Sequence, residues 1–127
     1  MSKKPMIRHI AIITLDPERL AKFYEEAFQM ERVKRPERPG GPSESKAVFM
    51  TDGHITLALL QNKAEGKPPG LNHIGFTVDS QEEMAARFEK FGLTVAKRPA
   101  DRPFAETRGT DPDGNNIDLS VAGYGNG

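Results

Sequence analysis

The chain of 127 residues contains no cysteine. Without thiols it can form no disulfide, no thiolate zinc site and no cysteine nucleophile. Any metal ion that this protein binds must therefore be held by nitrogen and oxygen ligands. The length suits a single domain, since folded domains commonly run to about 100 to 150 residues.

An excess of charge of either sign is also missing. Eighteen lysine and arginine residues balance eighteen aspartate and glutamate residues. Because no net field draws the chain to nucleic acid or to an anionic membrane, neither is expected as a partner. The basic cluster RVKRPER at 32–38 is interrupted by glutamate and proline, and it is expected to be a solvated strand and loop.

Long apolar runs are the third thing that the sequence lacks. The opening segment MSKKPMIRH carries positive charge but leads into no apolar h-region, and no run is long enough to span a bilayer. We therefore expect a cytoplasmic protein that acts on a small-molecule substrate.

What the sequence does contain is an internal near-repeat, HIAIITLD from His9 and HIGFTVD from His73. Each copy is an alternating apolar strand that leads into a helix. The first helix has Asp16 as its N-cap candidate, and the second has Asp79 or Ser80. Helical spacing of apolar residues predicts helices from 17 to about 30 and from about 80 to 91.

Three short strand-like segments follow each helix. They are ERVKR, KAVFMT and ITLALLQ in the first half, and LTVAKR, FAETRGT and NIDLSVA in the second. Two Asp-Gly pairs, at 52–53 and 113–114, predict tight turns between neighbouring strands. Residues 36–45 are expected to form a long loop, and residues 62–70, rich in Lys, Gly and Pro, a linker.

These segments predict one α+β domain over residues 1–127, built from two similar modules at about 5–61 and 71–122. Each module reads as a strand, a helix and three further strands. Neither module is large enough to bury both faces of a sheet alone, so the two are expected to pair.

Strand alternation places His9, His73 and Asp118 on faces whose neighbours are small or polar. A single histidine in a strand is more often a hydrogen-bonded core or surface residue than a ligand. Two histidines at equivalent positions of a repeat, together with a carboxylate, match the ligands of the facial triad. They predict a site for one divalent ion, which could be Fe²⁺, Mn²⁺, Ni²⁺ or Zn²⁺.

The paired strands, the helix with Phe23-Tyr24 and the segment DPDGNNIDL at 111–119 resemble the vicinal oxygen chelate superfamily. That superfamily includes glyoxalase I, bleomycin-resistance proteins, fosfomycin-resistance enzymes and extradiol dioxygenases. The resemblance covers nearly the whole chain. It implies two βαβββ modules whose curved mixed sheets surround a metal cleft, with His9, His73 and Asp118 as ligands, and it suggests a homodimer.

The chain departs from the family pattern in two places. Asp118 stands where the family usually has glutamate, and Ala58 falls where glyoxalase I-like members carry a fourth ligand, also glutamate. The site therefore resembles that of the three-ligand members, the ring-cleaving dioxygenases and fosfomycin-modifying enzymes, more than that of glyoxalase I.

Further residues are candidates for catalysis and for substrate binding. Glu106, in a strand that the family places beside the cleft, is the first candidate for an acid or base. His54 is the second, although a residue in a turn is more often simply exposed. Three arginines are predicted to bind a carboxylate or phosphonate of the substrate, with a solvated face as the alternative. They are Arg98, Arg102 and Arg108.

Three functions remain open at this point. The first is a metal-dependent enzyme whose substrate chelates the ion through vicinal oxygens, as an extradiol-type dioxygenase or a glyoxalase-like lyase or isomerase. The second is a fosfomycin-type transferase, which requires a cationic pocket and a loop for a monovalent cation. The third is a metal-free drug-binding module of the bleomycin-resistance kind.

Overall fold

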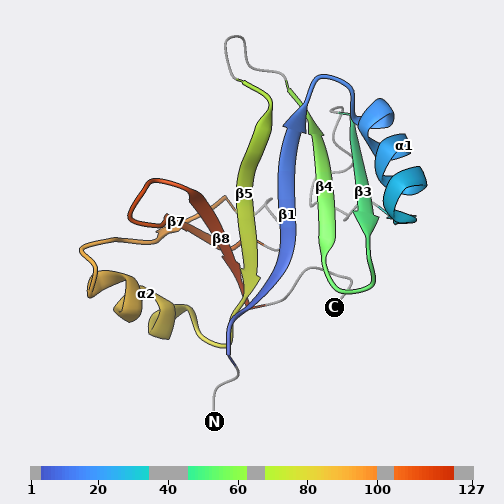
Figure 1. The fold of residues 1–127 in the computed structure, drawn as a ribbon. Helices are drawn as coiled ribbons and strands as arrows, with labels where there is room; N and C mark the ends of the chain where they lie inside the picture. Colours follow the sequence, from blue (N-terminus) through green and yellow to red (C-terminus); the bar gives the residue numbers. More distant parts are fainter. Residues whose placement is uncertain (1–3, 35–45, 63–67, 100–104, 122–127) are drawn as a thin grey trace.

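The computed structural model describes residues 4–34, 46–62, 68–99 and 105–121. Its elements repeat the order strand, helix and three strands (Figure 1). The first module comprises β1 (Met6–Thr14), α1 (Pro17–Phe28), β2 (Glu31–Val33), β3 (Ala47–Thr51) and β4 (Thr56–Gln61). The second comprises β5 (Gly70–Thr77), α2 (Gln81–Glu89), β6 (Ala96–Lys97), β7 (Thr107–Thr110) and β8 (Asn116–Ser120). The predicted α+β class with two βαβββ modules is confirmed.

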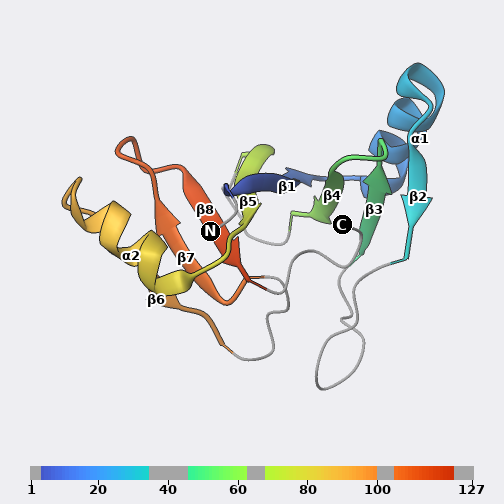
Figure 2. The ribbon, with the colours of Figure 1, turned by 90° about the horizontal axis from the view of Figure 1, so that it is seen from below.

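The described strands form one mixed sheet in the order β2-β3-β4-β1-β5-β8-β7-β6. Within each module the first strand pairs in parallel with the last, β1 with β4 and β5 with β8. The antiparallel pairing of β1 with β5 joins the two modules within one chain. Figure 2 shows that the sheet is curved, with α1 and α2 on its outer side.

The core of the first module lies between α1 and the sheet. Its buried side chains are Ala21, Val48, Met50, Leu57 and Leu59. Full burial of side chains of this size stabilises a fold by about 1.5–3 kcal/mol each. A second, smaller apolar cluster of Ala11, Phe49 and Ala58 lies apart from this one, so the core of the module is in two parts.

The second module is packed more loosely. None of the residues of α2, all of which the structure describes, is buried. An apolar pocket lies between α2 and the sheet, and its lining includes Phe88, Phe91, Leu93 and Ile117.

Of the residues that the structure describes, none belongs to a helix that is long and apolar enough to cross a membrane.

Both helices begin where the capping residues predict. The side chain of Asp16 accepts a hydrogen bond from the backbone N–H of Arg19 at 3.1 Å. In the second module Ser80, rather than Asp79, is the N-cap, and its hydroxyl accepts from the N–H of Glu83 at 3.1 Å. The first helix ends at Phe28, slightly before the predicted end, because Gln29 turns into the left-handed region with φ 56°. The second helix likewise ends at Glu89, before the predicted residue 91.

Several strands are shorter than predicted, mainly at the edges of the sheet. Among the described strands, β2 pairs with β3 alone and β6 with β7 alone, so each extends no further than that partner allows. The two predicted Asp-Gly turns are present, with φ of 97° at Gly53 and 90° at Gly114. Strand β5 begins at Gly70, inside the predicted linker. The predicted loop at 36–45 lies outside the described residues.

Candidate metal centre

The cross-strand register brings the predicted ligands to one face of the sheet. His9 on β1 pairs with Gly75 on β5, which pairs in turn with Asp118 on β8. His73 lies two residues before Gly75 on the same strand, and therefore points to the same side. The neighbouring row, on the side that faces the helices, consists of Ile10, Ile74 and Ile117. The three ligand candidates thus lie on the face opposite α1 and α2.

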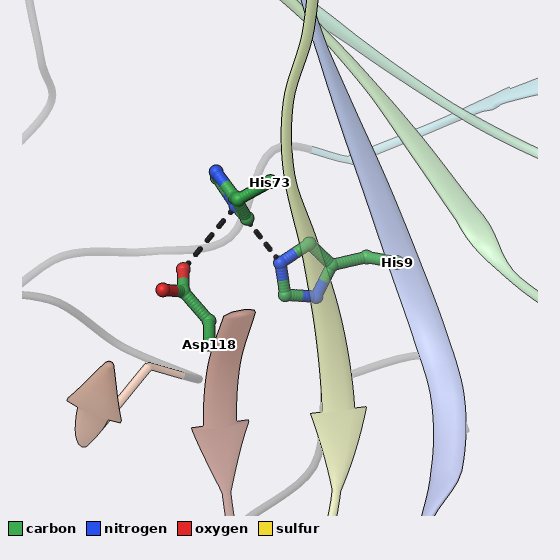
Figure 3. Close-up of side chains that lie close together, drawn as sticks. All are labelled: His9, His73 and Asp118. Atoms are coloured by element: carbon green, nitrogen blue, oxygen red, sulfur yellow. Dashed lines mark hydrogen bonds and ion pairs between the residues drawn. The ribbon is translucent and has the colours of Figure 1, made fainter. Parts of the chain in front are cut away.

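Their side chains converge (Figure 3). The Nε2 atom of His73 lies 3.1 Å from Nε2 of His9 and 3.2 Å from Oδ2 of Asp118. Two ligands that are each about 2.1 Å from an ion, at right angles to one another, lie about 3.0 Å apart. Among the described residues, this is the group of three metal-ligating side chains whose ligand atoms all lie within 4.8 Å of one another. The spacing suits a single ion held from one side.

Two irregularities in the pairing of β1 with β5 flank this group. The register shifts at Arg8, directly before His9, and at Asn72, directly before His73. A bulge turns a side chain away from the regular alternation, so that sequence neighbours can meet on one side of a strand. As a result Oδ1 of Asn72 lies 2.7 Å from Nδ1 of His73. Asn72 was not foreseen as part of the site, because periodicity does not reveal a bulge.

Two contacts of Nδ1 bear on the tautomer of His73: Oδ1 of Asn72 at 2.7 Å favours a proton on Nδ1, and Nη2 of Arg108 lies further away, at 3.4 Å. Burial lowers the pKa of His73 to about 4, so at pH 7 the ring is neutral and carries one N–H. In the tautomer whose Nδ1–H donates to Asn72, the lone pair of Nε2 faces the carboxylate of Asp118 and the ring of His9. Two acceptors at this distance repel one another unless a cation or a proton lies between them. The donor set therefore fits a divalent cation.

The other two groups are also in the protonation state that a metal requires. Burial, followed by the nearby His73, lowers the pKa of His9 to about 4. Burial alone would raise the pKa of Asp118, but its hydrogen bonds with Arg108 and the charges around it outweigh this and hold that pKa below its ordinary value. His9 and Asp118 are only 4% and 3% exposed.

Gly75 provides the space for His9. A Cβ atom at this position would lie 1.8 Å from Cε1 and 2.2 Å from Nδ1 of the imidazole, so the ring lies directly against the backbone of β5. In the other copy of the repeat, Ala11 pairs with His73. A small residue two positions after each histidine was visible in the sequence, although its role was not recognised.

Arg108, predicted to bind substrate, contacts Asp118. Its Nε donates to Oδ1 at 2.5 Å and its Nη2 to Oδ2 at 3.1 Å. The two residues are direct partners in the β7–β8 hairpin. Asp113 lies midway between them in the predicted Asp-Gly turn, so residues five positions before and after it face one another. This spacing could have revealed the pair from the sequence. A substrate role for Arg108 stays a prediction.

Among the described residues, Glu106, His54 and Arg98 are not part of the group of three. Glu106, just before β7, accepts a hydrogen bond from the backbone N–H of Val121 at 2.7 Å, and its carbonyl accepts from the N–H of Arg98 at 2.9 Å. His54 lies exposed in the β3–β4 turn, outside the group of three. Catalysis by Glu106 or His54 and substrate binding by Arg98 stay predictions. Arg102 lies outside the described residues.

The position of the missing fourth ligand is apolar in the structure as well. Ala58 on β4 pairs with Ala11 on β1, which pairs with His73. It is buried, and it packs with Ala11 and Phe49. The methyl group of Ala58 offers no ligand atom, so the first module contributes His9 and an adjoining apolar surface.

Comparison with protein families gives a match over most of the chain. The model described as the Glyoxalase/Bleomycin resistance protein/Dioxygenase superfamily matches residues 6–119. No curated protein sequence matches the chain significantly.

Solved structures share the fold at low identity. The hypothetical protein BH1468 from Bacillus halodurans C-125 matches with a TM-score of 0.68 and 19% identity, over 92% of this chain and 94% of that one. The methylmalonyl-CoA epimerase from Mycobacterium tuberculosis matches with a TM-score of 0.65 and 17% identity, over 89% of this chain and 85% of that one. The 2,3-dioxygenase LapB from Pseudomonas sp. KL28 matches with a TM-score of 0.63 and 20% identity, over 91% of this chain but 40% of that one. At these identities the likeness shows the fold alone.

Proposed function

This chain belongs to the glyoxalase/bleomycin resistance protein/dioxygenase superfamily, and on that premise we propose that it is a divalent-metal-dependent enzyme. Its substrate is a small molecule that binds the ion through two neighbouring oxygens. The observation that carries the proposal is the convergence of two imidazole Nε2 atoms and a carboxylate oxygen with spacings of 3.1 and 3.2 Å.

His9, His73 and Asp118 would hold the ion, which would supply Lewis-acid chemistry to the oxygens of a bound substrate. The protein's own part is to hold the ligands in place and to keep one side of the ion open. Asn72 favours the tautomer of His73 whose Nε2 can bind a metal, the backbone at Gly75 supports the ring of His9, and Arg108 orients Asp118. Contacts of this kind around the ligands tune metal affinity as well as geometry.

Two forms of the reaction are proposed, an extradiol-type dioxygenase and a glyoxalase-like lyase or isomerase. Three ligands on one side of an ion leave positions for both a chelating substrate and dioxygen, which supports the dioxygenase. Glu106 is proposed first as the acid or base, since the other candidate, His54, lies in an exposed turn. The superfamily also supports a homodimer, and we keep a cytoplasmic location as part of the proposal.

One observation favours a second candidate, a metal-free binding module. The bidentate contact with Arg108 balances the charge of Asp118 without any metal ion. In such a module the same face of the sheet would bind a small drug-like molecule.

Metal analysis separates the two candidates. Chelator-stripped protein is reconstituted with Fe²⁺, Mn²⁺, Ni²⁺ or Zn²⁺ in turn, and the bound ion is measured by mass spectrometry. We expect one ion per chain for at least one metal, loss of that ion in His73→Ala, and retention in the matched variant His54→Ala. Failure to bind any of the four ions would leave the binding module as the better account.

A further inference from the structure

The charges of the candidate metal centre already balance without an ion. An imidazole such as that of His9 or His73 binds a metal ion only in its neutral form, and the carboxylate of Asp118 is paired with the guanidinium of Arg108 through two hydrogen bonds. The negative charge of the carboxylate is therefore already compensated before any metal ion binds. The four groups together carry no net charge.

An ion bound by these residues adds two positive charges that none of the four groups offsets. His9 and Asp118 are almost fully buried, and charges in such surroundings are screened far less than at the surface. The ion and these four groups together therefore carry two net positive charges.

We propose that the loaded centre takes a chelating ligand with two negative charges, and that Arg108 is the residue that selects for this charge. Such ligands include small dicarboxylates and vicinal diols that bind as dianions. The inference rests on the proposed metal-dependent function, and it adds the charge class of the substrate.

Arg108 would act on the ligand in addition to orienting Asp118. Its Nη2 lies 3.1 Å from Oδ2 of Asp118, the oxygen that faces His73, so the guanidinium borders the position of the ion. A ligand oxygen on the ion at this edge of the site gains a charge-assisted hydrogen bond. The same guanidinium repels the ion itself.

These two roles predict effects of opposite sign in Arg108→Gln. Metal affinity should rise several-fold, because a positive charge beside the ion is removed. Oxalate, a small chelating dianion, should bind the metal-loaded variant about tenfold more weakly or worse, in line with the strength of charge-assisted contacts. If Arg108 only held Asp118 in place, both affinities would fall.

Isothermal calorimetry tests this with Zn²⁺-loaded protein and two probes, oxalate and the neutral chelator glycolamide. We expect Arg108→Gln to weaken the binding of oxalate but not that of glycolamide. Arg108→Lys should recover much of the affinity for oxalate. The matched control is Arg87→Gln, which removes the same charge from an exposed pair with Glu83 on α2 and should change neither probe. Metal content is measured after each titration to verify that the ion stays bound.

Oxalate and glycolamide affinities that fall together in Arg108→Gln, or a fall in metal affinity, would overturn the inference while leaving the metal site in place. Failure of the wild-type protein to bind Zn²⁺ or any of the other three ions would instead overturn the proposed function. The two failures are therefore distinguishable.

Discussion

At the scale of single residues, the site depends on side chains that bind no metal themselves. Oδ1 of Asn72 lies 2.7 Å from Nδ1 of His73, and this contact favours the tautomer whose Nε2 can act as a ligand. It can do so because the bulge in β5 places it on the same side as its neighbour.

Replacing Asn72 with leucine should reduce metal affinity about tenfold or more, the usual effect of removing a group that orients a histidine ligand. Asn72→Asp supplies an acceptor again and should restore affinity at least to the wild-type level. Competition with a chromogenic chelator measures both variants. Equal affinities in the wild-type and leucine proteins would show that Asn72 does not set the tautomer.

Gly75→Ala should displace the imidazole of His9, because the new methyl group would overlap the ring. We expect loss of metal binding together with a decrease of about 1–3 kcal/mol in the free energy of unfolding, as for other overpacked sites. The matched change at the equivalent position of the repeat, Ala11→Gly, opens space beside His73 and should keep the metal. Metal content and urea unfolding of both variants check this, and a metal-binding Gly75→Ala protein would contradict it.

At the scale of elements, the two helices are stabilised differently. Helix α1 covers a buried cluster, whereas α2 buries none of its described residues and depends more on its own capping. The sequence offered Asp79 and Ser80 equally as caps for α2, because both residue types suit that position. The structure assigns the cap to Ser80 through its contact with Glu83.

Ser80→Ala should therefore lower the free energy of unfolding by about 1 kcal/mol, the typical effect of losing an N-cap hydrogen bond. Asp79→Ala should have a smaller effect, since the N–H of Glu83 keeps its partner. Urea unfolding followed by circular dichroism compares the two. A larger loss in Asp79→Ala would mean that the cap has been assigned to the wrong residue.

At the scale of the whole molecule, the repeat was enough to predict two modules and the faces of their strands. Alternation has a period of two, so it placed His9, His73 and Asp118 on one face without knowledge of which strands pair. It could not locate the bulges at Arg8 and Asn72, because these depend on how β1 pairs with a strand about sixty residues away. Edge strands were overestimated for a similar reason, since their length is set by their partners.

The buried histidines make the stability of the metal-free protein depend on pH. The pKa of His9 and of His73 is about 4 in the folded protein against an ordinary value of 6.5, so the unfolded chain binds more protons in between. Stability should be fully present above pH 6.5 and fall as the pH drops toward 4, by on the order of 3 kcal/mol for each histidine. Urea unfolding of chelator-stripped protein at pH 7, 6 and 5 measures the slope. His73→Ala should show a shallower slope, and no change between pH 7 and 5 in the wild type would contradict the burial of neutral rings.

The central claim is that one divalent ion is bound by His9, His73 and Asp118 together. Anomalous X-ray scattering from crystals of the reconstituted protein, recorded on both sides of the absorption edge of the metal, tests it most directly. We predict a single strong peak within about 2.0 to 2.2 Å of an Nε2 atom of each histidine and an oxygen of the carboxylate. A metal peak at another position would contradict the claim. So would the absence of a peak here while Arg108 keeps its hydrogen bonds to Asp118.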